Sequence, residues 1–186
     1  LLRHRDRARL DLVLVLAPLG LAVGVTWLEE RGLWAVVDVP LAPMAFVLHP
    51  VMLLRVVDHF RAVPRWVAAL MVVSVAASWA LLALAPAVGT QRAHVVVVAL
   101  FALGLLYAAR SLTRGARHAQ GVVRRRMRFV TAGALLIAVV AFLGVVGMLQ
   151  PTLTSRMDVI TQALALLAMA AYALGLAPPS WLSRSW

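Results

Sequence analysis

A chain of 186 residues in which 63% are hydrophobic and only 13% are charged is too apolar for a soluble domain, where about half are apolar and a quarter charged. It has no cysteine, which excludes disulfides, thiolate metal sites and cysteine nucleophiles. All eighteen basic residues are arginine and the formal net charge is +11. Because these arginines lie between hydrophobic runs and not along one soluble face, a nucleic-acid partner is not expected.

Six apolar segments follow one another along the chain. They cover residues 12–28, 33–54, 66–86, 93–109, 129–149 and 159–178. Each has about 17 to 22 residues, the length that an α-helix rising 1.5 Å per residue needs to cross roughly 30 Å of hydrocarbon. The sequence therefore predicts an all-α, polytopic transmembrane helical bundle of six spans. Residues 1–186 are expected to form this one domain, with no soluble domain beside it.

The links between these segments alternate in charge. Residues 29–32 are acidic, residues 55–65 and 110–128 are basic, and fifteen of the eighteen arginines fall on one side of the predicted membrane. Arg31, Arg92 and Arg156 fall on the other side. Because positively charged links stay in the cytoplasm during insertion, both ends of the chain are predicted to be cytoplasmic.

The second segment contains three prolines, Pro40, Pro43 and Pro50, and two ionisable residues, Asp38 and His49. A proline lacks the amide donor and crowds the preceding turn, so this helix is predicted to kink or to begin late. Broken helices often line cavities. Asp38, near the outer end, is either a carboxylate that senses a ligand or proton, or a polar residue at an interfacial helix start. The sequence leaves both interpretations open.

His49 is the one histidine predicted to lie at membrane depth. His94 is near the outer surface and the other three histidines belong to the cytoplasmic side. This chain alone is therefore not expected to hold a metal, a haem or another cofactor. Two roles remain for His49, a packing or hydrogen-bonding residue, or a proton or ligand switch.

Polar and aromatic side chains in the third, fourth and sixth segments also have two interpretations. They either serve close helix packing, since hydroxyls and amides bond across helices, or they line a ligand cavity. The candidates for this cavity are Trp79, Tyr107, Gln162 and Tyr172.

The link between the fourth and fifth segments is the most basic part of the chain. Residues 110–118 are predicted to continue the fourth helix, with their basic side chains on a shared face. Juxtamembrane arginines attract anionic lipid by roughly 1 kcal/mol each, so this link is expected to lie against the inner leaflet. The arginines predicted to contact anionic lipid are Arg110, Arg114, Arg117, Arg124, Arg125 and Arg126.

Catalytic motifs are absent from the sequence. It has no His-Glu-x-x-His zinc motif, no Gly-x-Ser-x-Gly nucleophile turn, no glycine-rich phosphate loop and no paired intramembrane carboxylates. Intramembrane hydrolysis and active transport lack the residues to perform them, so the chain is not expected to be an enzyme.

Three parts of the chain carry a family resemblance. They are residues 175–182, which read Gly-Leu-Ala-Pro-Pro-Ser-Trp-Leu, residues 48–64, which run from a Leu-His-Pro sequence to an aromatic-then-proline turn, and the basic residues 121–128. Together they resemble the multi-pass N-terminal membrane region of certain bacterial sensor histidine kinases. There the last helix ends in a Gly-x-x-Pro-Pro-x-Trp-Leu-Arg type of motif before the cytoplasmic signalling part.

The resemblance implies the bacterial cytoplasmic (inner) membrane and a kinase that lies beyond Trp186 or is lost. Such regions commonly have seven spans, which implies that the first is missing here. Two departures stand against it. Ser180 and Ser183 replace arginines that are usual, and neither a helix with a phosphoaccepting histidine nor an ATP-binding part is present.

Three hypotheses of function follow. The first is a sensor and anchor module that passes helix rearrangement to a cytoplasmic output. The second is a non-enzymatic integral subunit that packs against a larger redox or photosynthetic membrane complex. The third, a small permease, would call for more polar groups at the midplane than this chain offers. The expected partners are the lipid bilayer, anionic lipids and other membrane chains, as a homodimer or a larger complex.

Overall fold

The computed structural model describes residues 4–30, 41–60, 62–150 and 154–178. Within these ranges the chain forms eight helices and no strand, which confirms the all-α prediction. The helices are α1 His4–Glu30, α2 Leu41–Val47, α3 His49–Phe60, α4 Arg65–Ala83, α5 Ala85–Val88, α6 Thr90–His118, α7 Gly121–Leu149 and α8 Thr154–Leu176.

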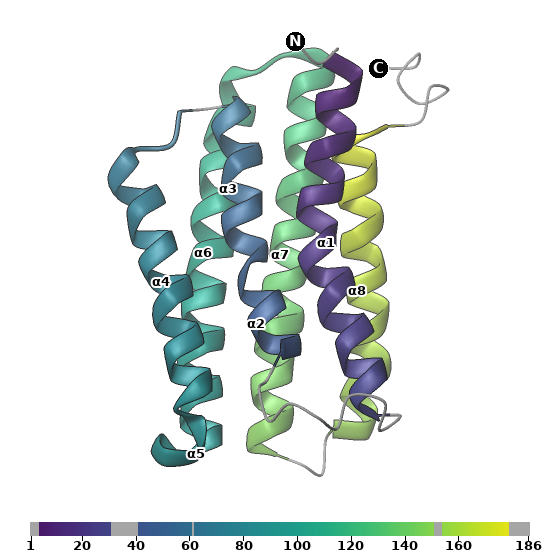
Figure 1. Ribbon diagram of the computed structural model, residues 1–186. Helices are drawn as coiled ribbons and strands as arrows, with labels where there is room; N and C mark the ends of the chain where they lie inside the picture. Colours follow the sequence, from purple (N-terminus) through teal and green to yellow (C-terminus); the bar gives the residue numbers. More distant parts are fainter. Residues whose placement is uncertain (1–3, 31–40, 61, 151–153, 179–186) are drawn as a thin grey trace.

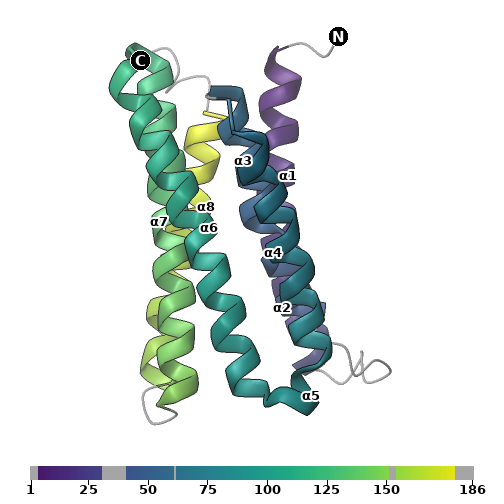
Figure 2. The same cartoon turned by 90° about the vertical axis from the view of Figure 1, so that its left-hand side faces the viewer.

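The helices lie side by side as an elongated bundle (Figure 1). Helices α2 and α3 follow one line as a single broken pass, and the four-residue α5 forms a turn, so the eight helices make six passes. The start of α1 and the end of α8 lie at the same end of the bundle, as an even number of passes requires. In Figure 2, α1 to α4 gather on one side (the first half) and α6 to α8 on the other (the second half).

Five stretches of the described chain are long and apolar enough to cross a membrane. They are Pro43–Phe60, Arg65–Ala83, Thr90–His118, Gly121–Gly147 and Val159–Leu176. For the remaining predicted span, residues 12–28, α1 is helical throughout, but the apolar stretch that the structure describes there is the shorter Leu10–Ala22. By the length and composition of its helices the chain is a multi-pass membrane protein.

Several helices end some residues away from the approximate boundaries predicted for the spans. The second span was expected to end at residue 54, but α3 continues to Phe60, and the third was expected to reach residue 86, but α4 ends at Ala83. The basic residues before the fifth span are helical from Gly121. A helix makes its backbone hydrogen bonds internally, so it can continue past the hydrocarbon into the headgroup layer. Residues there are polar, and hydropathy therefore does not indicate where the helix ends. The predicted helical continuation through residues 110–118 is confirmed by α6.

The predicted break in the second span is also confirmed. Leu48 interrupts the helix, and its amide donates to the carbonyl oxygen of Ala45 at 3.1 Å, three residues back. The amide of Val51 likewise donates to Leu48 O at 3.1 Å. Pro50, which has no amide to continue the ladder, lies between these two short-range bonds. His49 is thereby placed at the first residue of α3.

The buried core joins both halves of the bundle. Leu53, Leu105, Val130 and Tyr172 are fully enclosed, and they come from α3, α6, α7 and α8. Helix α4 lies at the edge (Figure 1), with only Val67, Ser78 and Leu82 buried among its side chains. The core therefore places the start of α3 at the meeting point of the two halves.

Candidate functional site

His49 is a fully buried ionisable side chain at the start of α3. Its side chain has 0% exposure, and both of its ring nitrogens have a partner. Nδ1 lies 2.9 Å from the carbonyl oxygen of Val15 on α1, and Nε2 lies 3.0 Å from the hydroxyl oxygen of Tyr172 on α8. One imidazole therefore ties three helices together.

The partners fix the tautomer of this imidazole. A neutral imidazole has one N–H donor and one acceptor nitrogen, and a backbone carbonyl can only accept. Nδ1 of His49 must therefore donate to Val15 O, and Nε2 must accept from the hydroxyl of Tyr172. This arrangement satisfies every polar atom of the ring without a charge in the apolar interior.

Aromatic rings and one glycine enclose this pair. The rings of His49 and Tyr172 meet edge to face with centroids 5.4 Å apart, and Phe101 on α6 lies 6.3 Å from His49. Phe46 on α2 stacks on Phe101 at 4.3 Å. Gly133 on α7 leaves room for the tyrosine, since a Cβ there would lie 2.9 Å from Tyr172 Cδ1. All six passes except that of α4 thus contribute to the site.

The end of α8 is held by an arginine of α7. Arg126 donates from Nε to Gly175 O and from an Nη atom to Leu176 O, both at 2.8 Å. These carbonyls belong to the last turn of α8, where no following amide of the helix remains to donate to them. Gly175 also permits close contact, because a Cβ there would lie 2.7 Å from Val130 Cγ2. The exit of α8 is therefore fixed to α7.

The structure brings together two of the predicted ligand-binding residues and separates the others. His49 and Tyr172 are bonded, whereas Trp79 on α4 donates from Nε1 to Met44 O at 3.1 Å and is 38% exposed. Tyr107 is partly buried against the core. Gln162 is exposed on α8, ten residues before Tyr172 and so about 15 Å away along the axis. Side chains this far apart, facing different directions, do not line one cavity.

Asp38, the remaining predicted ligand-binding residue, lies outside the described residues. The carbonyl of Val15 as a partner of His49 and the cap formed by Arg126 were not predicted, because the sequence carries no signal for either. Gly133 does carry a signal, since a glycine within a span marks a close approach to another helix.

The predicted lipid-binding arginines divide into three groups. Arg117 and Arg124, joined by Arg128, line a hollow of about 310 Å³ between the facing ends of α6 and α7. The two threonines in its lining, Thr113 and Thr131, donate their hydroxyls to carbonyls of their own helices. The positive charge of the hollow therefore comes from its arginines.

The remaining predicted lipid-binding arginines do not line this hollow. Arg110, Arg114 and Arg125 are exposed, and Arg126 turns to α8 as described above.

Comparison of the chain with protein-family models, with curated proteins and with solved structures finds no match. The geometry described above is therefore the basis for assigning a role.

Proposed function

We propose that this chain is the membrane-embedded sensing and anchoring module of a signal-transducing protein. A change in packing around the broken pass α2–α3 alters α8, and α8 passes the change to a cytoplasmic output. The observation that carries this proposal is the hydrogen bond between His49, at the break, and Tyr172, one turn before the end of α8. The bond joins the first half of the bundle to the second.

The energy of this bond suits a switch. A hydrogen bond between membrane helices contributes about 0.6–1.7 kcal/mol, which biases a two-state equilibrium by a factor of roughly 3 to 20. A stimulus that separates His49 from Tyr172 would therefore change the populations of two packings without unfolding either one. Because Arg126 holds Gly175 O and Leu176 O, a movement of α8 would move its junction with α7 as well.

Arginine placement supports the proposed orientation, whereas the bacterial cytoplasmic membrane as the location rests on the family resemblance. The end of the bundle where α8 ends carries most of the described arginines, namely Arg5, Arg7, Arg9, Arg55, Arg65, Arg110, Arg114, Arg117, Arg124, Arg125, Arg126 and Arg128. Arg92 in the first turn of α6 and Arg156 in the first turn of α8 lie at the opposite end. By the retention of positive charge inside, the exit of α8 faces the cytoplasm.

The experiment measures signalling output from the full-length gene product in membrane vesicles, as autophosphorylation if the reading frame encodes a kinase core. Tyr172→Phe removes one hydroxyl and should change the output several-fold. Tyr107→Phe is the matched control, since Tyr107 is the only other tyrosine and has no bond to His49. Equal output from the wild type and both variants would overturn the proposal.

A non-enzymatic subunit of a larger membrane complex is the second candidate. The observation that favours it is the outward face of α4, where Ala69, Val73 and Ala77 are exposed at helical spacing. Small residues in a membrane helix allow another helix to approach closely. Co-purification with other membrane proteins at a fixed stoichiometry, lost in Ala69→Phe, would select this candidate over the sensor.

A further inference from the structure

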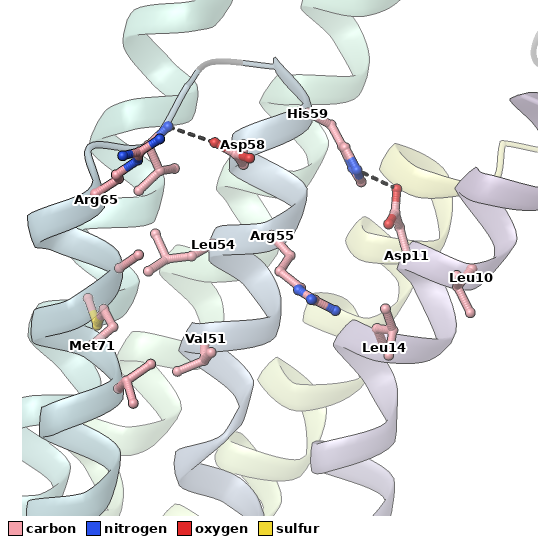
Figure 3. Close-up of a pocket in the computed structure, with 13 residues that line it drawn as sticks. Leu10, Asp11, Leu14, Val51, Leu54, Arg55, Asp58, His59, Arg65 and Met71 are labelled. Atoms are coloured by element: carbon pink, nitrogen blue, oxygen red, sulfur yellow. Dashed lines mark hydrogen bonds and ion pairs between the residues drawn. The ribbon is translucent and has the colours of Figure 1, made fainter.

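A groove of about 560 Å³ runs along α3 between α1 and α4, at the end of the bundle where α3 ends (Figure 3). This volume falls within the range of about 300–1,000 Å³ that is usual for small-molecule sites. The groove is separate from the His49 site and shares none of its side chains.

One part of the groove is apolar. Leu14 of α1, Val51 of α3 and Met71 of α4 line it from three directions, and Val72 beside them is 60% exposed. All but Leu14 belong to stretches apolar enough to span the membrane. The floor of the groove is therefore continuous with the hydrocarbon.

The other part of the groove is polar, with its two carboxylates already engaged. Asp11 Oδ2 lies 3.2 Å from His59 Nδ1, and Asp58 Oδ1 accepts a hydrogen bond from the amide of Val63 at 2.8 Å (Figure 3). These residues lie in the last turn of α3, in the link after it and on the facing turn of α1. The polar part therefore lies toward the end of the bundle, where α3 ends.

Two guanidinium groups in this part have no such partner. Among the residues that the structure describes, neither Arg55 of α3 nor Arg65 of α4 has an ion pair or a side-chain hydrogen bond. An arginine beside an apolar surface gains most from an anion, because charge-assisted hydrogen bonds to carboxylate or phosphate are about twice as strong as neutral ones. The groove therefore holds two guanidinium groups next to its apolar floor whose N–H donors have no acceptor among the described residues, although its formal charge is balanced by Asp11 and Asp58.

We propose that this groove binds a single-chain amphiphile with an anionic head, such as a long-chain carboxylate. The chain lies on the apolar floor along Leu14, Val51 and Met71, and the head accepts hydrogen bonds from Arg55 and Arg65. The polar rim fixes the head at the membrane surface, and the volume suits one chain.

The groove also adjoins the His49 site. Leu14 lines it, and the carbonyl of the next residue, Val15, accepts the bond from His49. An occupant that separates α1 from α3 would therefore strain that bond. This coupling rests on the proposed function, whereas binding to the groove does not.

The test uses palmitate carrying a photoactivatable diazirine, with the protein in phosphatidylcholine nanodiscs. We expect saturable crosslinking to α1, α3 or α4, competed by unlabelled palmitate but not by inorganic phosphate. Arg55→Gln combined with Arg65→Gln should weaken binding about tenfold or more, since two charged hydrogen bonds are lost. Leu14→Trp, which fills the floor, should also reduce it.

Two further variants separate charge from folding. Arg55→Lys combined with Arg65→Lys keeps both positive charges and should retain much of the binding. Arg110→Gln removes an exposed arginine at the same end of the bundle but outside the groove, and should bind palmitate as the wild type does. Thermal unfolding of each variant in detergent checks that it is folded.

Three results would overturn the proposal. The first is crosslinking that does not saturate, or that photoactivatable phosphatidylcholine reproduces, since either would indicate annular lipid only. The second is competition by inorganic phosphate alone, and the third is a crosslink between two copies of this chain at the groove, which would show that a second copy occupies it. Saturable palmitate binding without any effect on signalling output would leave the site in place and instead overturn its coupling to the proposed function.

Discussion

Tyr172 on α8 donates a hydrogen bond to His49 on α3 across 3.0 Å, and both side chains are fully buried. The two residues are 123 positions apart in the sequence. Because removal of the hydroxyl would leave the acceptor nitrogen of His49 buried and unpaired, the bond is expected to matter for stability as well as for signalling.

Tyr172→Phe should therefore destabilise the bundle. The change keeps the ring against Gly133 and removes only the hydroxyl, leaving Nε2 of His49 buried and unpaired. We expect a loss of about 1–3 kcal/mol in the free energy of unfolding, measured by reversible denaturation in mixed micelles. Tyr107→Phe should change the stability by less than about 0.5 kcal/mol. Similar losses in both variants would contradict the role given to the bond.

A double-mutant cycle isolates the His49–Tyr172 interaction itself. His49→Phe alone removes both ring bonds and leaves Val15 O and the Tyr172 hydroxyl without a partner, so it should cost more than Tyr172→Phe alone. The double variant should be more stable than the sum of the single losses predicts, by about 0.6–1.7 kcal/mol. Additive losses would show that the two side chains do not interact.

The sequence was sufficient for the passes and for the break, since both depend on local chemistry. Hydrocarbon thickness sets the length of an apolar run, and Pro50 cannot donate to the helical ladder wherever it lies. The depth of His49 follows from its position in such a run. These features need no knowledge of neighbouring helices.

The partner of His49 could not be predicted in the same way. To identify Tyr172 as the partner, one must know which face of α8 is turned toward α3. A helix that is apolar on nearly every side has no periodic pattern that indicates this orientation. The same difficulty applies to the arginine run of α7. Arg125 and Arg126 have the same chemistry, and it is the orientation of α7 about its axis that turns Arg126, and not Arg125, toward α8.

Gly133→Ala tests the packing around the tyrosine. The added methyl would lie 2.9 Å from Tyr172 Cδ1, so either the ring or α7 must move. We expect a destabilisation of about 1–3 kcal/mol, as for other overpacked sites. Gly144→Ala is the control on the same helix, because nothing lies within 4 Å of its Cβ position. There alanine should stabilise by up to about 1 kcal/mol through helix propensity. A stabilising effect at both positions would argue against the close contact.

Arg126→Gln should loosen the end of α8. The shorter amide side chain cannot reach Gly175 O and Leu176 O in the same fork, so two carbonyls of the last turn lose their donors. We expect faster amide hydrogen exchange in the last turns of α8, and little change in α6. Arg125→Gln, at an exposed arginine of the same helix, should leave exchange in α8 unaltered. Equal exchange in the two variants would exclude the cap as the restraint on α8.

The orientation of the bundle can be tested with single cysteines, since the chain has none of its own. Ala87 in α5 and Gln120 in the link before α7 are both exposed, and α6 runs from one end of the bundle to the other between them. In intact cells a membrane-impermeant maleimide should label Ala87→Cys and should reach Gln120→Cys only after the membrane is opened. Arginines cluster around Gln120, and their retention inside during insertion is the physical reason for this asymmetry. Labelling of both cysteines in intact cells would mean that α6 does not cross the bilayer. The proposal that a change at Leu48 is passed through the membrane to a cytoplasmic output would then be wrong.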